Sequence, residues 1–354
     1  MSLDPTEMQA PGADQGELVQ ALFRALLGRN AESEAVEAFA RLPGAEAIAQ
    51  GIAASEEFKR KHSSPFWHYT SCFDAVGLMR KYAVSCEPKE GYIVNFLGVA
   101  ISPKFLPLIL EPMVGEVQPI PLPANWHADI AEWGAVLRSI DLAVETYTVA
   151  ELGCGWGCWI NNAGVTAKRR GLKVHAIGVE GDPGHIEFAR EACAINGLDA
   201  DEVTLHNAVA SGQDGYTLFP VQKHAGHEWG LEAVFDATPE QRETAARAGT
   251  HLELRTMSMK SVAQGRKLDL LHIDIQGAEL DVVERSREFL RSNVAYMMIG
   301  THSRRIEGRL MEALLDDGWV LEIERPAQLS VRSGSPIVSV DGVQGWRNTL
   351  LTAS

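Results

Sequence analysis

The sequence predicts an α/β fold in which helices cover both faces of a mostly parallel sheet. From Tyr147 onward, apolar stretches typical of strands alternate with stretches of helical periodicity, and such alternation is typical of parallel sheets. A glycine-rich turn joins the first of these strands to the first helix. Hydrophobic residues make up 45% and charged residues 22% of the 354 residues, which are ordinary values for a globular protein.

The first 62 residues precede this pattern and predict a leader followed by a helical module. Residues 1–13 are polar and contain Pro5, Pro11 and Gly12, so we expect a loose leader. In residues 14–62, apolar residues recur at helical spacing with two glycine-containing breaks, which predicts three short helices. The stretch from ALFRALLGRN to IAASEEF resembles a small module attached to bacterial surface-polysaccharide enzymes, although a docking bundle without chemistry explains it equally well.

Residues 63–146 are rich in aromatic residues and broken by prolines, and we expect them to form a lead-in that covers the sheet. They end in a predicted helix over residues 127–143. Asn125, Trp126, His127 and Asp129 cluster near the start of that helix. These side chains either cap the helix and fill an interface or line the mouth of a site, and the sequence leaves both interpretations open.

The last segment, residues 147–354, contains the alternating pattern. Strands are predicted at 147–155, 173–182, 202–211, 268–277, 293–303 and 319–326, and helices at 158–171, 183–197, 278–292 and 305–318. A polar insertion at about 211–255 interrupts the alternation, and a last strand is predicted within PIVSVDG at 336–342. In open sheets of this kind, ligands bind at the carboxyl ends of the strands.

Composition limits the classes of partner and the compartment. The net charge of −15 would repel a phosphate backbone, so we do not expect a nucleic-acid substrate. The five cysteines are scattered and no signal segment is recognisable, which favours free thiols in a reducing cytoplasm, and we interpret Cys154 and Cys158 as packing residues without zinc. No apolar run approaches the roughly 20 residues of a membrane span. We therefore expect a soluble, cytoplasmic protein.

The strongest motif is the turn from Glu151 to Gly157, in which an acid precedes Gly153, Cys154, Gly155, Trp156 and Gly157. Glycine lets the backbone turn sharply and approach a ligand closely. A dinucleotide site would have glycine at position 158, and a carboxylate would repel a pyrophosphate. S-adenosylmethionine carries an ammonium and a sulfonium group, which Glu151 would attract. A glycine turn that only packs the helix onto the strand is the alternative.

Further candidates for a nucleoside site follow the next two strands. Glu180 and Gly181 end the second strand, where a carboxylate can accept both ribose hydroxyls. Asp182 is better explained as the N-cap of the following helix. Asn207 and Ala208 end the third strand, where an amide could bind adenine, although asparagine is also a common strand terminator.

Candidates for acceptor chemistry follow the fourth and fifth strands. Asp274 lies where the fourth strand opens beside the first, and the D-I-Q-G turn favours an oxygen acceptor over an exocyclic amine. We expect His272 to be a hydrogen-bonded core histidine and Glu279 to begin the next helix. His302 ends the fifth strand and is a candidate general base for a hydroxyl, while capping by its neighbours is the alternative.

Several strings resemble the FkbM family of methyltransferases, namely GYIVNFLGVAISPKF, PLPANWHADIAEW, ELGCGWGCWINN, GVEGDPGHIEFA, HIDIQGAE and GTHSRRIEGRL. The resemblance covers about residues 80–325. It implies a Rossmann-like, seven-stranded class I methyltransferase sheet and O-methylation of natural products or glycans. At the fourth strand many relatives resemble K-I-D-V-E-G, whereas this sequence has His272 in place of the Lys and Gln276 in place of the Glu. The resemblance therefore supports no acid, base or metal role at these two positions.

The expected reaction is one in-line transfer of the methyl group of S-adenosylmethionine to a hydroxyl of a small-molecule or glycan acceptor. Glu151 and the glycine turn would hold the methionine end, Glu180 the ribose and Asn207 the adenine, while Asp274 and His302 would orient and deprotonate the hydroxyl. A divalent metal near Asp274 could replace the base, and a homo-oligomer stays open. An NAD(P)-dependent Rossmann oxidoreductase and a non-catalytic scaffold are the alternatives.

Overall fold

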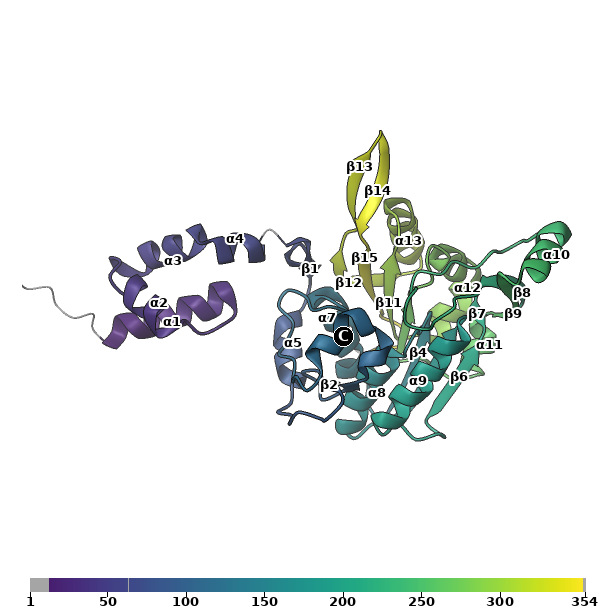
Figure 1. Cartoon of the computed structure of the whole chain (residues 1–354), viewed down its shortest axis with the longest axis horizontal. Coiled ribbons are helices and arrows are strands. Elements are labelled where there is room, and N and C mark those ends of the chain that lie inside the picture. Colours follow the sequence, from purple (N-terminus) through teal and green to yellow (C-terminus); the bar gives the residue numbers. More distant parts are fainter. Residues whose placement is uncertain (1–12, 63, 353–354) are drawn as a thin grey trace, which may run out of the picture. The chain divides into compact units, whose positions relative to one another are not determined.

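The computed structural model describes residues 13–62 and 64–352, which belong to two compact units divided after Trp67 (Figure 1). The first unit contains α1 (Ala13–Leu27), α2 (Ser33–Phe39), α3 (Gly44–Ala54), α4 (Glu56–His62) and the short turn η1 (Pro65–Trp67). Four helices thus stand where the periodicity predicted three. Their small core includes Val19, Phe23, Ile48 and Ile52. The leader predicted at 1–13 lies outside the described residues except for Ala13, which begins α1.

The second unit is built on a mostly parallel sheet, as the alternation predicted. Neighbouring strands follow the order β1 (Thr70–Ser71), β12 (Trp319–Arg325), β15 (Gly342–Asn348), β11 (Tyr296–Thr301), β10 (Leu270–Ile273), β4 (Thr146–Leu152), β5 (Lys173–Glu180) and β6 (Val203–Asn207). The strands from β11 to β6 are parallel, whereas β15 runs antiparallel between β11 and β12. The strands from β12 to β6 form the expected seven-stranded Rossmann-like sheet, and β1 extends its edge.

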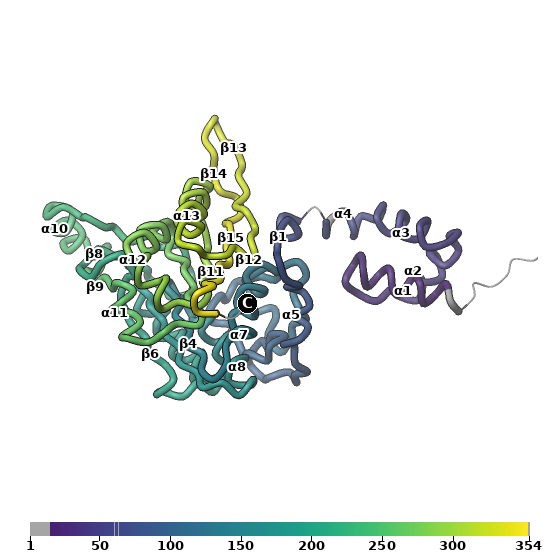
Figure 2. The backbone as a smooth tube through the Cα atoms, turned by 180° about the vertical axis from the view of Figure 1, so that it is seen from behind, coloured from purple at the N-terminus to yellow at the C-terminus, as the bar shows by residue number. Residues whose placement is uncertain are grey.

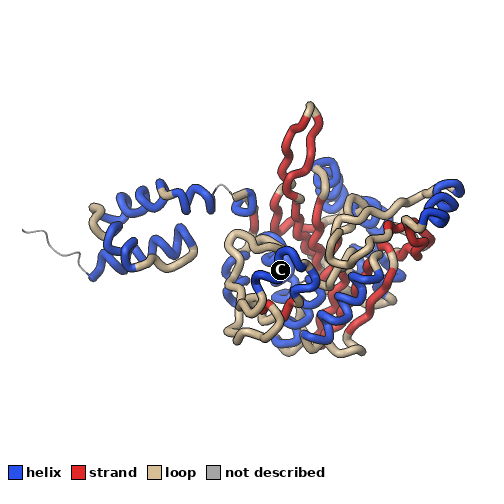
Figure 3. Tube along the Cα trace, in the orientation of Figure 1, coloured by secondary structure: helices blue, strands red, loops and turns tan. Residues whose placement is uncertain are grey.

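Helices cover both faces of this sheet (Figure 3). One layer contains α7 (Ile130–Leu142), α8 (Cys158–Arg169) and α9 (Pro183–Ile195), and the other contains α11 (Met259–Ala263), α12 (Glu279–Asn293) and α13 (Arg304–Asp316). The strands β4, β10 and β11 are almost fully buried, and side chains from them share a hydrophobic core with α12 and α13. Because both faces are covered, the carboxyl ends of the central strands form the edge that ligands can reach.

The last strand of the sheet is not the one that the sequence predicted. Residues 335–340 form β14 (Ser335–Val340), which pairs only with β13 (Gln328–Arg332) in a ribbon apart from the sheet (Figure 2). The strand that enters the sheet is β15, whose residues are nearly all buried while those of β14 are largely exposed. Gly342 and Gly345 interrupt the apolar pattern of β15, so periodicity alone does not mark these residues as a strand.

The insertion and the lead-in add structure around the sheet. The predicted third strand divides into β6 and β7 (Val209–Ala210), and β7 joins β9 (His251–Met257) and β8 (Gly215–Pro220) in a separate small sheet that also carries α10 (Pro239–Ala248). The lead-in contains α5 (Ala75–Tyr82), the short strands β2 (Ile93–Val94) and β3 (Ala100–Ile101), the turns η2 (Pro103–Phe105) and η3 (Glu111–Met113), and α6 (Pro107–Leu110) before α7. Among the described residues, no helix is long and apolar enough to cross a membrane.

Candidate functional site

A cavity of about 470 Å³ lies at the carboxyl ends of the central strands. The sequence-predicted residues that line it are Glu151, Gly153, Cys154, Gly155, Trp156, Glu180, Gly181, Ala208 and Asp274. Gly157, Asn207 and His302 are not among the described lining residues. Residues 228–231 of the insertion also line the cavity, so residues far apart in the sequence enclose one space.

The glycine turn between β4 and α8 requires glycine for two separate reasons. Gly153, Gly155 and Gly157 all have positive φ angles, of 74°, 52° and 76°, a region that L side chains rarely adopt. A Cβ atom on Gly153 would also lie 2.0 Å from the carbonyl oxygen of Asp274, and one on Gly155 would lie 2.8 Å from the ring of Trp229. The turn therefore brings bare backbone against both Asp274 and the insertion.

Glu151 points from the end of β4 to the first turn of α8. Its carboxylate accepts hydrogen bonds from the backbone N–H groups of Trp159 at 3.1 Å and Ile160 at 2.9 Å. Burial raises the pKa of Glu151 to about 8, even though these hydrogen bonds favour the charged form. The amides at the start of a helix ordinarily offer a binding site for an anion, and here Glu151 occupies them.

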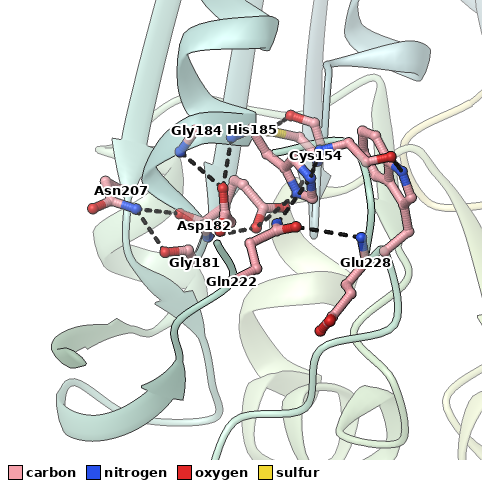
Figure 4. Close-up of polar contacts among 12 residues, drawn as sticks. Cys154, Gly181, Asp182, Gly184, His185, Asn207, Gln222 and Glu228 are labelled. Carbon is pink, nitrogen blue, oxygen red and sulfur yellow. Dashed lines mark hydrogen bonds and ion pairs between the residues drawn. The ribbon is translucent and has the colours of Figure 1, made fainter. Parts of the chain in front are cut away.

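Glu180 is held in a similar way at the end of β5. Its carboxylate accepts hydrogen bonds from Gly155 N at 2.9 Å and Asp182 N at 2.7 Å. Burial raises the pKa of Glu180 to about 7. Asp182 caps α9 as predicted, because its side chain accepts hydrogen bonds from the amides of Gly184 and His185 (Figure 4).

Asn207, the predicted contact of adenine, is not among the described residues that line the cavity. Its side-chain amide donates hydrogen bonds to the carbonyl oxygens of Glu180 at 3.0 Å and Gly181 at 2.8 Å (Figure 4). The side chain therefore fixes the loop that follows β5, a position typical of an asparagine that terminates a strand. Its neighbour Ala208 does line the cavity.

The insertion closes one side of the cavity through an aromatic stack that the sequence analysis missed. Trp229 stacks on His185, with ring centroids 3.9 Å apart and an interplanar angle of 7°. Nε2 of His185 accepts a hydrogen bond from Gly226 N at 3.2 Å and lies 3.1 Å from the amide nitrogen of Gln222 (Figure 4). The string QKHAGHEWG carried the only available signal, since it places aromatic residues and glycines in an otherwise polar insertion.

Three side chains form a charged cluster where β10 and β11 end. His302 Nε2 lies 3.3 Å from Oδ1 of Asp274, and His302 Nδ1 lies 2.8 Å from Oε1 of Glu279. Burial would lower the pKa of His302, but the hydrogen bonds and charges of the two carboxylates raise it to about 10. His302 is therefore protonated at neutral pH and is unsuited to the general-base role that the sequence suggested.

Asp274 keeps its charge and remains open to the cavity. Burial would raise its pKa, but the hydrogen bond and the charge of His302 outweigh burial and lower it. Its side chain is 43% exposed although it lies deep in the molecule, because the cavity reaches it. The cluster of Asp274, Glu279 and His302 could also hold a metal ion, because its ligand atoms lie within 4.8 Å of one another. Without a metal ion, the two N–H groups of the imidazolium bind the two carboxylates.

Two neutral histidines stand beside Asp274 with unsatisfied nitrogen atoms. Burial lowers the pKa of both His127 and His272 to about 4. His127 Nε2 and His272 Nδ1 are buried and have no hydrogen-bond partner among the described residues, yet both residues line the cavity. His272 is buried in the core as predicted, but its Nδ1 lacks the expected hydrogen bond. Of the group near α7, Asn125 and Asp129 bind backbone amides as caps, whereas His127 faces the site.

Comparisons with known proteins fit this arrangement. A family model described as "Methyltransferase FkbM domain" matches residues 144–316. A protein of Jannaschia sp. (strain CCS1) named "Putative methyltransferase" is 46% identical over 271 residues, which are 76% of this chain and 97% of that protein.

Solved structures give weaker likenesses. A crystal structure of Methyltransferase FkbM from Methylobacillus flagellatus KT is 11% identical, with a TM-score of 0.37, over 61% of this chain and 54% of that chain. A ribosomal protein L11 methylase from Lactobacillus delbrueckii subsp. bulgaricus is 15% identical, with a TM-score of 0.32, over 61% of this chain and 78% of that chain. Both TM-scores lie below 0.5, so neither structure bears on the activity of this chain.

Proposed function

The chain belongs to the FkbM family of methyltransferases, and we propose that it transfers the methyl group of S-adenosylmethionine to a hydroxyl of a sugar-like or other small acceptor. When bound, S-adenosylmethionine supplies an electrophilic methyl group on a positively charged sulfur. The residues of the cavity suit such a ligand, because Glu151, Glu180 and Asp274 are carboxylates and none of the described lining residues is Lys or Arg.

The position of Glu151 carries this proposal. In dinucleotide-binding folds, the amides at the start of the first helix bind a pyrophosphate. Here the carboxyl group of Glu151 already accepts the hydrogen bonds of two of those amides, so they are not free to bind an anion. A bound ammonium group favours the charged form of this carboxyl group and gains an ion pair with it, which favours S-adenosylmethionine over NAD(P).

The remaining residues suggest how the chain handles the acceptor. Asp274 would accept the hydrogen bond of the attacking hydroxyl, and His302 and Glu279 would hold Asp274 in place. As the new C–O bond forms, the hydroxyl becomes far more acidic than a carboxylic acid, so even a carboxylate with a lowered pKa can take its proton. No metal ion is needed for this step, although the cluster of Asp274, Glu279 and His302 could hold one.

Calorimetric titration tests the proposal directly. We expect the protein to bind S-adenosylhomocysteine and not NAD(H), and to transfer labelled methyl groups to hydroxylated acceptors. Binding of NAD(H) without S-adenosylhomocysteine would instead support an oxidoreductase. Binding of neither ligand would leave the sheet as a scaffold.

A further inference from the structure

The carboxylates of the cavity form a row along the carboxyl edge of the sheet. Glu180 ends β5, Glu151 lies in the neighbouring β4, and Asp274 follows β10, the next strand. Asp341 extends this row, because it precedes β15, and Gly342 of β15 pairs with Thr301 at the end of β11. Asp341 also lines the cavity, although the sequence analysis gave it no role.

The charged groups that act on each carboxylate follow the same order along the edge of the sheet. Burial raises the pKa of Glu151, and the charges of Asp274 and Glu180 raise it further. Burial likewise raises the pKa of Asp341, whose charged neighbours are His302, Asp274, Arg325 and Glu279. Asp341 thus stands beyond Asp274, on the side away from Glu151 and Glu180. The proposed function assigns Glu151 to the methyl donor, and the sequence predicts that Glu180 binds its ribose, which leaves the region of Asp274 and Asp341 for the acceptor.

The described residues at the acceptor end of the cavity are poorly suited to bind an anion. None of the described residues that line the cavity is Lys or Arg. Arg325 lies near Asp341 but is buried and forms an ion pair with Asp129, and it also donates a hydrogen bond to the backbone carbonyl of Asp341. His302 is the other cation whose charge acts on Asp341, and its two nitrogens face Asp274 and Glu279.

The part of the cavity beside Asp274 offers hydrogen bonds to an uncharged ligand. His272 is only 4% exposed, and its Nδ1 has no hydrogen-bond partner among the described residues, although it lies 3.7 Å from Oε1 of Glu151 on the donor side. Nε2 of His127 is also buried and has no hydrogen-bond partner among the described residues. A buried polar atom without a partner is costly unless a ligand or water satisfies it. A neutral imidazole can bind a hydroxyl group in either tautomer, because it has one donor and one acceptor.

We propose that the acceptor group entering this cavity is a polyol or amino-polyol without an anionic substituent, and that Asp341 binds it through its hydroxyl or ammonium hydrogens. This inference rests on the proposed function and narrows its substrate class. Asp341 is an acceptor-binding residue, and His127 satisfies a further hydroxyl group. Phosphate, sulfate and carboxylate groups are excluded from the part of the acceptor inside the cavity, because they would meet several carboxylates that the single positive charge of His302 does not balance.

Matched sets of acceptors test the proposal. Each set contains a methyl hexoside, the corresponding amino sugar and the corresponding uronic acid, offered with labelled S-adenosylmethionine. We expect the uronic acid to have a kcat/KM at least about tenfold below that of the better of the other two, because a charge is repelled and hydrogen bonds are lost. Equal or better transfer to the uronic acid, or transfer to no member of any set, would overturn the proposal.

Variants at Asp341 test whether this residue determines the preference among acceptors. Asp341→Asn should raise KM about tenfold for the amino sugar and less for the methyl hexoside, with kcat unchanged, because only the ammonium group loses an ion pair. Asp341→Lys should reverse the preference towards the uronic acid. Asp201→Asn, a change at an exposed aspartate outside the cavity, is the matched control. A KM that stays unchanged in Asp341→Asn for every acceptor would contradict the role of Asp341.

Titration with S-adenosylhomocysteine separates this inference from the proposed function. One outcome is that the nucleoside binds to the parent protein and to both Asp341 variants with equal affinity while the expected order of kcat/KM among the acceptors is not observed. In that case the inference about the acceptor is wrong, and the proposed donor site is still supported. If the nucleoside does not bind at all, the proposed function itself is wrong.

Discussion

The imidazole of His302 bridges the carboxylates of Asp274 and Glu279, with Nε2 3.3 Å from Asp274 and Nδ1 2.8 Å from Glu279. Both ring nitrogens therefore donate hydrogen bonds, which only the imidazolium can do. A cation between two carboxylates keeps Asp274 charged and correctly oriented at the cavity. The bridge thus changes the role expected of His302 from a proton acceptor to a positioning residue.

The pH dependence of activity should distinguish these two roles. With a lowered pKa, Asp274 is already ionised in neutral solution, so we expect kcat to be flat across the neutral range. Since the pKa of His302 is about 10, kcat should fall as pH approaches that value and the bridge loses its proton. The rate of labelled methyl transfer under saturating substrate, measured across this pH range, checks the prediction. If His302 were the base, kcat would instead rise towards pH 10.

The same shift predicts how stability depends on pH. The folded-state pKa of His302, about 10, lies above its ordinary value of 6.5, so the stabilisation is fully present below pH 6.5 and is lost as pH rises through about 10. His302→Gln removes this dependence, and the free energies of unfolding of parent and variant should converge between these pH values. Urea denaturation at several pH values measures the difference, and a gap that stays constant would show that no raised pKa exists.

Asp274→Asn should abolish most of the activity while leaving donor binding intact. The amide keeps the shape of the side chain but cannot take a proton, and loss of such a group typically lowers kcat by about 10² to 10⁴. His302→Gln should lower kcat less, because Asp274 remains. Calorimetry with S-adenosylhomocysteine should give similar affinities for both variants and the parent. A parent-like kcat in Asp274→Asn would mean that another group takes the proton.

Sequence patterns predicted the sheet, the glycine turn and the row of acids, since each depends on local periodicity or on where a strand ends. They could not predict the state of His302, because Asp274, Glu279 and His302 come from two separate connections that meet only after folding. The hydrogen bonds of Asn207 were not predictable for a similar reason, as the carbonyl groups that it binds belong to another strand end. Trp229 and Asp341 lie in segments without regular periodicity, so nothing local marked them as lining residues.

Glu151→Gln should weaken binding of the amino-acid part of the nucleoside selectively. The amide can still accept the hydrogen bonds from the start of α8, but it no longer attracts an ammonium group, so Kd for S-adenosylhomocysteine should rise about tenfold. Methylthioadenosine lacks that group and should bind parent and variant equally. Because the pKa of Glu151 is about 8, affinity of the parent for S-adenosylhomocysteine should increase as pH rises through 8, and the variant should lack this increase. Equal losses for both ligands would point to a folding defect.

Gly155→Ala should disrupt the donor site through Trp229 as well as through backbone strain. The new Cβ would lie 2.8 Å from the tryptophan ring, at a φ of 52° that disfavours any side chain. Gly197→Ala is the matched control, since Gly197 has a φ of 70° but nothing within 4 Å of its Cβ position. Both variants should lose about 1–2 kcal/mol of stability from the backbone, whereas only Gly155→Ala should weaken S-adenosylhomocysteine binding. Adding Trp229→Ala removes the clash, so binding should partly recover in the double variant if the ring is what the new methyl group displaces. Equal binding by Gly155→Ala and the parent would mean that the donor does not approach the turn.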